Sequence, residues 1–234
     1  MIWGKEPDML EGKKKRARTD TLMYTAYQTI KEAICTGEIR SGDLLSESQI
    51  AAGMGISRTP LREALAALEN EGLVEIRRGV GAKVKPLSQR DVIYVYELRR
   101  VLEPLAAQTA VLHLTKKDLQ EFRASFQGLI QYQDAPLQVQ ITKYAEVDWH
   151  FHMAIVEKSE NPYLPKMMNL ILPTIRRLQV ISYRPENYSL EETVAQHMEL
   201  IDALESGDIA IVCQQIRDHL TWSMNGFLNP TTEW

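Results

Sequence analysis

The sequence is poor in cysteine and contains no long hydrophobic run. Only Cys35 and Cys213 occur among the 234 residues, with no second cysteine or close histidine beside either. This excludes a disulfide framework and a thiolate metal site, and it predicts two reduced, buried thiols. The longest apolar stretch, residues 167–175, is interrupted by Asn169 and Pro173. It is far shorter than the roughly 20 residues that a membrane-spanning helix needs.

An export signal is lacking as well. The charges near the N-terminus are not followed by an apolar signal core, which predicts a cytoplasmic protein with no membrane partner. The composition, 44% apolar and 25% charged, is typical of a globular protein. The length allows one large domain or two domains of modest size.

A strong surplus of positive charge, which usually marks a nucleic-acid-binding protein, is also absent, since the net charge is −4. The charge is nevertheless unevenly distributed. Residues 1–86 contain 14 Lys+Arg against 12 Asp+Glu (+2), which leaves 13 against 19 (−6) for residues 87–234. This mild asymmetry permits DNA binding by the N-terminal half if its basic groups converge on one surface.

Residues 21–86 show the pattern of three helices followed by a β-hairpin. Residues 1–20, which precede them, are expected to form a flexible basic arm. Helical spacing of apolar residues begins at Met23, and glycines mark the helix ends. A capping-box pair, Ser46 and Gln49, predicts the start of the short second helix.

The third helix and the hairpin complete the expected unit. Ser57 or Thr59 can cap this helix, and Gly72 ends it. Residues 73–85 then alternate apolar and polar side chains on both sides of a Gly-Val-Gly turn, which predicts a β-wing. Together these elements predict a winged helix-turn-helix that binds double-stranded DNA.

The start of the third helix carries the candidate base contacts. Arg58, Thr59 and Arg62 project from the side opposite the apolar face, at the end that enters the DNA groove in helix-turn-helix docking. Arginine can bind guanine through two hydrogen bonds, and Ser57 can reach phosphate or base. Arg78 in the wing adds a phosphate or minor-groove contact.

A second interpretation treats these arginines as ordinary solvated helix charges. Arg62 would then pair with Glu63 or Glu69 on its own helix. The combination of a short helix, a glycine break, a Ser-Arg-Thr-Pro entry and a glycine-tipped hairpin favours the DNA-binding interpretation.

From residue 87 onward the pattern is helical, so the predicted fold class is mainly α. The chain should consist of the winged helix-turn-helix and an all-α helical bundle, residues 87–229, with a short tail at 230–234. Helix starts are marked by capping pairs, namely Ser88 with Asp91, Thr115 with Asp118, and Ser189 with Glu192.

Four residues of this bundle can form a metal site. Asp148 and His152 share a helix face, and His197 and His219 lie on the apolar faces of two later helices. One carboxylate and three imidazoles suit a divalent cation such as zinc or nickel, with positions left open for water or a carboxylate ligand. Any one of these histidines alone is more typical of a hydrogen-bonded core residue.

Two other histidines are poorer candidates for a metal site. His150 and His152 could share one face of a strand as a His-x-His site, but the helical spacing of residues 144–156 argues against a strand. His113 precedes the capping Thr115 and has no ligand companion, so it is expected to be structural.

The N-terminal part resembles the GntR family of bacterial regulators. The resemblance covers residues 20–86 and rests on Gly37-Glu38-Ile39, Leu45-Ser46-Glu47, the segment Ile56-Ser57-Arg58-Thr59-Pro60-Leu61-Arg62-Glu63-Ala64-Leu65, and Glu71-Gly72-Leu73-Val74. It implies a homodimer on a palindromic operator, with Arg58, Thr59, Arg62 and Gly79 at DNA-contacting positions. Ser48 departs from the pattern, because some members carry an arginine there that touches DNA.

The C-terminal part resembles the FCD ligand-binding domain of FadR-type GntR regulators. The matching segments are Glu97-Leu98-Arg99-Arg100-Val101-Leu102-Glu103-Pro104, Asp148 with Phe151-His152, Asn161-Pro162, His197, and Arg217-Asp218-His219. The resemblance implies that Asp148, His152, His197 and His219 bind a metal that helps to anchor a small organic acid.

Arg99 and Glu103 are candidate effector-binding residues. Arg99 can pair with an effector carboxylate, and Glu103 can accept a hydrogen bond from a hydroxyl. An exposed intrahelical salt bridge is the alternative for this pair.

The favoured function is a DNA-binding regulator, a repressor, whose operator affinity is controlled by a small carboxylate effector docked at the metal. One alternative is a metal-responsive regulator without an organic effector. Another is a metal-dependent hydrolase, which the absence of a His-Glu-x-x-His arrangement and of a second general base disfavours, so no enzymatic activity is expected.

Overall fold

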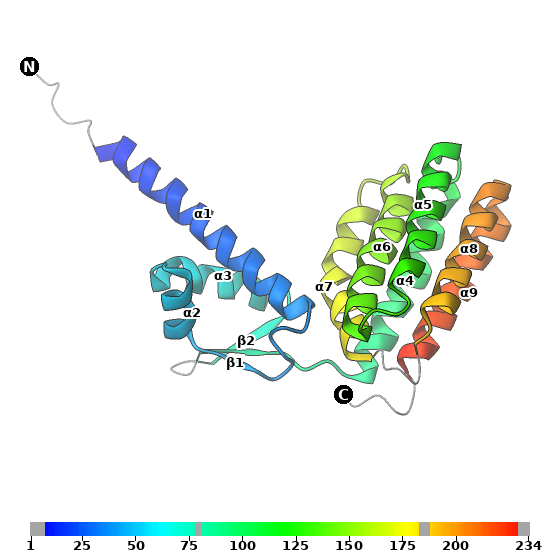
Figure 1. Ribbon diagram of the computed structural model, residues 1–234. Coiled ribbons are helices and arrows are strands. Elements are labelled where there is room, and N and C mark those ends of the chain that lie inside the picture. The colour runs from blue at the N-terminus through cyan, green and yellow to red at the C-terminus, as the bar shows by residue number, and fades with distance from the viewer. Residues whose placement is uncertain (1–7, 78–80, 183–187, 229–234) are drawn as a thin grey trace, which may run out of the picture. The chain divides into compact units, whose positions relative to one another are not determined.

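The computed structural model describes residues 8–77, 81–182 and 188–228, and the chain forms two compact units, Met1–Pro86 and Leu87–Trp234 (Figure 1). Both units are mainly helical, which confirms the predicted fold class. None of the helices in the described ranges is both long and apolar enough to cross a membrane.

The first unit contains three helices and a small sheet. In chain order its elements are α1 (Asp8–Cys35), β1 (Leu44–Leu45), α2 (Glu47–Met54), α3 (Arg58–Asn70), β2 (Val74–Arg77) and β3 (Gly81–Val84). The structure corrects the expected start of the first helix, which begins at Asp8 and not near Met23. The segment before Met23 is rich in Lys and Arg, which favour helix even without an apolar repeat, and no proline follows Pro7 there.

The core of this unit lies between α1 and α3, which pack against each other. Leu61, Leu65 and Leu68 on α3 are buried against Ala26 and Ile30 of α1 in one apolar cluster. One face of α3 is thus buried, and its opposite face is left to carry polar side chains.

The wing is a three-stranded antiparallel sheet with the order β1-β3-β2. The hairpin pairs Val74 with Val84, as the alternation predicts, and the additional two-residue strand β1 pairs Leu45 with Ala82. Gly81 stands at the close approach of β3 to β1. Its φ is 127°, and a Cβ there would collide with the carbonyl oxygen of Leu45, so this position requires glycine.

The second unit is a bundle of helices. Its elements are α4 (Gln89–Ala110), α5 (Lys116–Gly128), the 3₁₀ helix η1 (Leu129–Tyr132), α6 (Leu137–Glu157), α7 (Leu164–Ser182), α8 (Leu190–Ser206) and α9 (Ile209–Phe227). The predicted capping pairs start three of them, since Ser88 and Thr115 form full capping boxes and Ser189 accepts from the Glu192 amide. The expected box at Ser46 is wrong: Ser46 precedes α2, but its hydroxyl pairs with that of Ser48 and makes no cap hydrogen bond.

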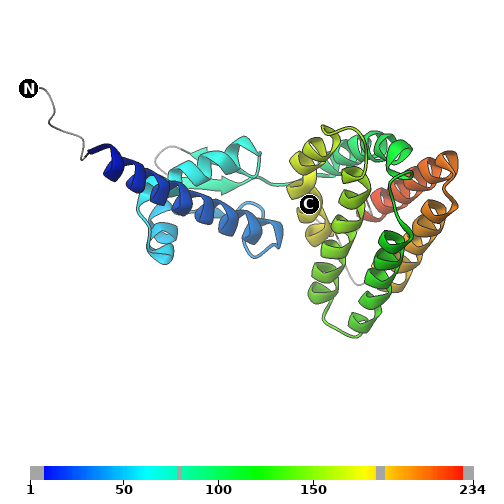
Figure 2. The ribbon, with the colours of Figure 1, turned by 90° about the horizontal axis from the view of Figure 1, so that it is seen from above.

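Helix α4 organises this bundle because it packs against α6, α7 and α9, while α8 joins α5 to α9. Helices α8 and α9, in orange and red, run side by side in both views (Figure 1, Figure 2). The main apolar cluster contains residues of all these helices, including Leu178 of α7. Leu164 and Met168, from the first half of α7, form a smaller cluster with residues of α4 and α6. Inward faces of α6, α8 and α9 therefore meet in the interior.

Candidate DNA-binding surface and metal centre

The start of α3 presents a polar, exposed face. Ser57 is the N-cap residue in an extended conformation, and Arg58, Thr59 and Arg62 are all exposed. Because Ser57 forms no side-chain cap hydrogen bond, its hydroxyl is available to a partner outside the helix. The unpaired backbone amides of this first turn also favour an anion such as phosphate.

Arg62 is not an isolated charge. Its Nε donates to Glu47 Oε2 on α2 over 2.7 Å, so the pairing with Glu63 or Glu69 that was weighed from the sequence is wrong. Glu69 instead accepts a hydrogen bond from the backbone amide of Ile76 in β2. The Arg62 side chain remains 63% exposed, so it can still reach a partner beyond Glu47.

Two predicted DNA-contact residues, Arg78 and Gly79, lie outside the described residues. Ser48 is exposed on α2. It stands at the position where some members of the resembled family carry an arginine.

In the second unit, four ligand-type side chains meet in the core. Asp148 and His152 come from α6, His197 from α8 and His219 from α9, and one ligand atom from each lies within 4.8 Å of the others. All four side chains are buried, with at most 3% of the residue exposed. The helical placement of residues 137–157 shows that the His-x-His strand alternative is wrong.

Neighbouring groups fix the orientation of two of the imidazoles. His152 Nδ1 lies 2.7 Å from Glu103 Oε2, and His197 Nδ1 lies 2.8 Å from the carbonyl oxygen of Thr193. Both oxygens can only accept, so each Nδ1 carries the proton that it donates. The Nε2 atoms are therefore directed toward Asp148, at 3.5 Å for His152 and 3.0 Å for His197.

The carboxylate of Asp148 is held by its own set of donors. The hydroxyl of Tyr144 donates to Oδ1 over 2.7 Å, and the amide Nε2 of Gln179, on α7, donates to Oδ2 over 3.0 Å. Burial opposes ionisation most strongly, but the nearby His152 and His197, whose Nε2 atoms lie 3.5 and 3.0 Å from Asp148 Oδ1, hold the pKa of Asp148 well below its usual value. Asp148 is thus an anion in the core.

The imidazoles respond to this anion unequally. Burial alone would lower the pKa of His152, but the charges of Glu103 and Asp148 raise it to about 9. Burial, followed by the charges of His197 and His152, holds the pKa of His219 well below its usual value. The cluster therefore combines a carboxylate, a protonated imidazole and a neutral one. A divalent cation would replace the imidazolium proton, because imidazole binds metal only when neutral.

Unpaired atoms show how well the residues fit a metal. His152 Nε2 and His219 Nδ1 are buried and have no hydrogen-bond partner within the described ranges. Such atoms are costly to leave unpaired, and a cation accounts for both. The nitrogen and oxygen donors fit zinc or nickel.

The remaining histidines lie apart from this cluster. His150 is exposed, with Nδ1 2.7 Å from the carbonyl oxygen of Glu146, and His113 is exposed beside Glu160.

Arg99 and Glu103 are buried behind His152 and do not form the exposed salt bridge that was the alternative. Arg99 Nε donates to Glu103 Oε1 over 2.6 Å, while the other Glu103 oxygen faces His152. Arg99 also contacts the hydroxyl of Tyr96, which pairs with Ser223 on α9. Both oxygens of Glu103 are thus in use, and Glu103 would orient His152 if the cluster held a metal.

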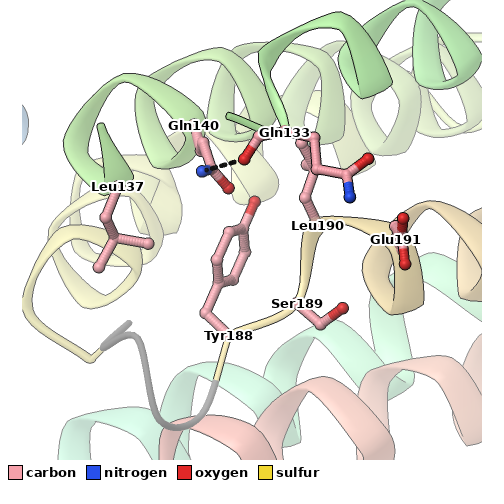
Figure 3. A pocket seen from close by; sticks show the side chains of 7 residues that line it. All are labelled: Gln133, Leu137, Gln140, Tyr188, Ser189, Leu190 and Glu191. Carbon is pink, nitrogen blue, oxygen red and sulfur yellow. Dashed lines mark hydrogen bonds between the residues drawn. The ribbon is translucent and has the colours of Figure 1, made fainter. Parts of the chain in front are cut away.

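A hollow of about 340 Å³ opens near the cluster, between the segment before α6 and the start of α8 (Figure 3). Gln133, Gln140 and Tyr188 line it, and the Tyr188 hydroxyl points toward Gln140. The Tyr188 ring packs on the ring of Tyr144, which bonds Asp148. Burial, and then the charge of Asp148, raise the pKa of Tyr188. The contact between the Tyr188 and Tyr144 rings therefore links this hollow to the cluster.

These two units define the class of protein: a winged helix-turn-helix joined to an all-α domain with a buried Asp/His cluster. Residues 22–84 match the family described as bacterial regulatory proteins, gntR family, and residues 94–221 match the FCD domain. The chain belongs to the GntR family of bacterial regulatory proteins and carries an FCD domain, as its sequence resemblance predicted. It is a transcriptional regulator and not an enzyme, so the hydrolase alternative is not supported.

Similar proteins extend over nearly the whole chain. The gluconate operon transcriptional repressor of Bacillus subtilis is 28% identical over 219 residues, which are 91% of this chain and 87% of the relative. The probable D-xylose utilization operon transcriptional repressor of Paenarthrobacter nicotinovorans is 26% identical over 211 residues, 90% and 91% of the two chains. Among solved structures, McbR/YncC of E. coli is similar with a TM-score of 0.74 and 23% identity, over 88% of this chain and 97% of that one.

Proposed function

We propose that this protein is a repressor that binds a palindromic operator as a homodimer in the cytoplasm. We further propose that a small organic acid, docked at a divalent metal ion, controls its affinity for the operator. The observation that carries the proposal is the buried cluster of Asp148, His152, His197 and His219, with two imidazole nitrogens left unpaired in the described part of the core. Relatives named as operon repressors support the direction of control.

The metal would be held by these four residues and would supply a positive charge that attracts a carboxylate. Glu103 and the Thr193 carbonyl would keep His152 and His197 in the tautomers that present Nε2. Tyr144 and Gln179 would hold the Asp148 carboxylate in place. The hollow beside Tyr188 is linked to the cluster through the Tyr144 ring, and we propose it as the entry for the acid.

DNA recognition is assigned to the exposed start of α3. Ser57, Arg58, Thr59 and Arg62 would contact bases and phosphates, and the wing residues Arg78 and Gly79 would add backbone contacts. An acid can alter this binding only if it has unequal affinity for two arrangements of the protein.

The test of this control is operator affinity in the presence of metal alone and of metal with an acid. We expect metal with acid to change the dissociation constant by about 5- to 150-fold, the range of typical allosteric coupling, and metal alone to change it little. Fluorescence anisotropy with a labelled operator, selected from random duplexes by the wild-type protein, measures this. A full response to metal alone would establish the metal-responsive alternative and exclude the acid.

Homodimer formation has its own support in the second unit. Helix α4 exposes Tyr94, Leu98, Val101 and Leu105, spaced at one face of a helix, and the neighbouring α7 exposes Leu170. Exposed apolar side chains gathered on adjacent helices are typical of a protein interface. A second copy of the chain is the occupant that a palindromic operator requires.

Val101→Asp should therefore separate the dimer. Val101 is 64% exposed in the single chain, so the substitution leaves the fold intact but buries a charge in each copy at the interface. We expect the dimer dissociation constant to rise by at least about 100-fold, measured by sedimentation velocity over a concentration series. Ile211→Asp on α9, where an exposed isoleucine lies outside this face, is the matched control. Equal dimerisation of both variants would exclude the α4 surface.

A further inference from the structure

Gln179 is a buried amide at the edge of the proposed metal site. It lies on α7 with 2% of its surface exposed, and its Nε2 donates to Asp148 Oδ2 over 3.0 Å. No spacing or motif in the sequence marks this residue, because its partner lies 31 positions away on another helix.

The contact with Asp148 decides which way the amide faces. A carboxylate can only accept hydrogen bonds, so the amide must turn its NH₂ group toward Asp148 and its Oε1 elsewhere. The two ends of an amide are about 2 Å apart, so Oε1 lies within about 5 Å of the Asp148 carboxylate. A buried acceptor therefore lies close to the Asp148 carboxylate.

This acceptor has no partner in the described ranges. Among the described residues, three such atoms belong to the cluster itself or to the amide bonded to it: His152 Nε2, His219 Nδ1 and Gln179 Oε1. A cation would account for the two nitrogens. It does not account for Gln179 Oε1, because Gln179 is not one of the four proposed ligands and contacts Asp148 Oδ2 through its NH₂ group. A buried acceptor without a donor is costly, so Oε1 calls for a donor that arrives with a ligand.

Apart from the two imidazole nitrogens, the polar groups named around Asp148 are already paired. The Tyr144 hydroxyl donates to Asp148, Nδ1 of His197 donates to the Thr193 carbonyl, and Glu103 is shared by Arg99 and His152. Among the polar groups of the described residues named here, Gln179 Oε1 is therefore the acceptor left for an organic ligand.

We propose that Gln179 determines effector specificity by accepting a hydrogen bond from a hydroxyl group on the acid, next to its carboxylate. This inference rests on the proposed acid control of the same site. A 2-hydroxy acid can direct both its carboxylate and its hydroxyl toward one cation, and a cation makes a bound hydroxyl a stronger donor. A site built around such a hydroxyl discriminates against the acid that lacks it, because the acceptor is then left unpaired.

Lactate and propionate are the probes that test this, because they differ by that one hydroxyl. We expect lactate to bind the zinc-loaded full chain at least about 10-fold more tightly than propionate, as isothermal titration calorimetry measures. In Gln179→Met, a substitution of similar shape, this preference should fall by about fivefold or more. Loss of the Nε2 contact with Asp148 weakens the binding of both acids alike. The ratio of the two dissociation constants therefore isolates the role of Oε1.

The control is Gln120→Met, which removes an exposed amide of α5 that does not line the hollow. It should leave the lactate preference unchanged. A preference that survives in Gln179→Met would overturn the assignment, since the hydroxyl would then be recognised by the cation or solvent alone. Equal binding of the two acids by the wild-type protein would overturn it without any variant. Failure of the zinc-loaded wild type to bind either acid would instead refute the proposed acid control, and this inference with it.

Discussion

Arg58→Ala and Arg62→Ala are each expected to lower specific operator affinity by about 5- to 150-fold, the equivalent of about 1–3 kcal/mol for a lost bidentate base contact. Both side chains are exposed at the start of α3, beside the buried face formed by Leu61, Leu65 and Leu68. The double variant should retain only the weak, salt-dependent binding that any duplex gives. Anisotropy titrations with the selected operator and with a scrambled duplex measure the two components.

The two arginines should not behave identically. Arg62 also pairs with Glu47, so its loss releases a surface ion pair worth at most about 1 kcal/mol. Arg90→Ala, at an exposed arginine of the other unit, is the matched control. Circular dichroism and metal content should be unchanged in all three variants. Wild-type operator affinity in Arg58→Ala and Arg62→Ala would show that the α3 assignment is wrong.

His197→Ala should reduce metal affinity by more than about 100-fold, since even loss of a residue that only orients a ligand costs 10–100-fold. His197 is fully buried, and its Nε2 lies 3.0 Å from Asp148. Metal at 100 times its dissociation constant should stabilise the wild-type protein by about 2.7 kcal/mol, and it should not stabilise the variant measurably. Metal analysis of the purified protein and thermal unfolding with and without added zinc or nickel measure this.

Two further variants make this result specific. Glu103→Gln keeps all four ligands but weakens the orientation of His152, so its metal affinity should fall to an intermediate value. His150→Ala removes an exposed histidine of α6, the helix that carries Asp148 and His152, and should leave the metal affinity unchanged. Unchanged metal stoichiometry in His197→Ala would refute the metal site, and sedimentation should show that dimerisation persists in every case.

Local signals made most of the fold predictable. A capping residue and the side chain three positions later lie within one turn, so Ser88 with Asp91 and Thr115 with Asp118 mark helix starts correctly. Likewise, Asp148 and His152 share a helix face because of the four-residue period alone. Signals of this kind need no knowledge of the rest of the chain.

Contacts between distant segments were not predictable. Glu103 meets His152 across 49 positions, and Arg62 meets Glu47 across 15, whereas sequence spacing suggested partners within the same helix. The early start of α1 was missed because it follows from the helix propensity of charged residues without an apolar repeat. The contact of Gln179 with Asp148 was not predictable, because a single buried amide forms no recognisable sequence pattern.

The two units have separate apolar clusters with no residue in common. A hydrophobic core is what makes a segment unfold cooperatively, so each unit can have its own melting transition in the full chain. Operator DNA would then raise the first transition, and metal or acid the second. A heat-capacity scan could thus register communication between the units directly, as a shift of one transition caused by the ligand of the other.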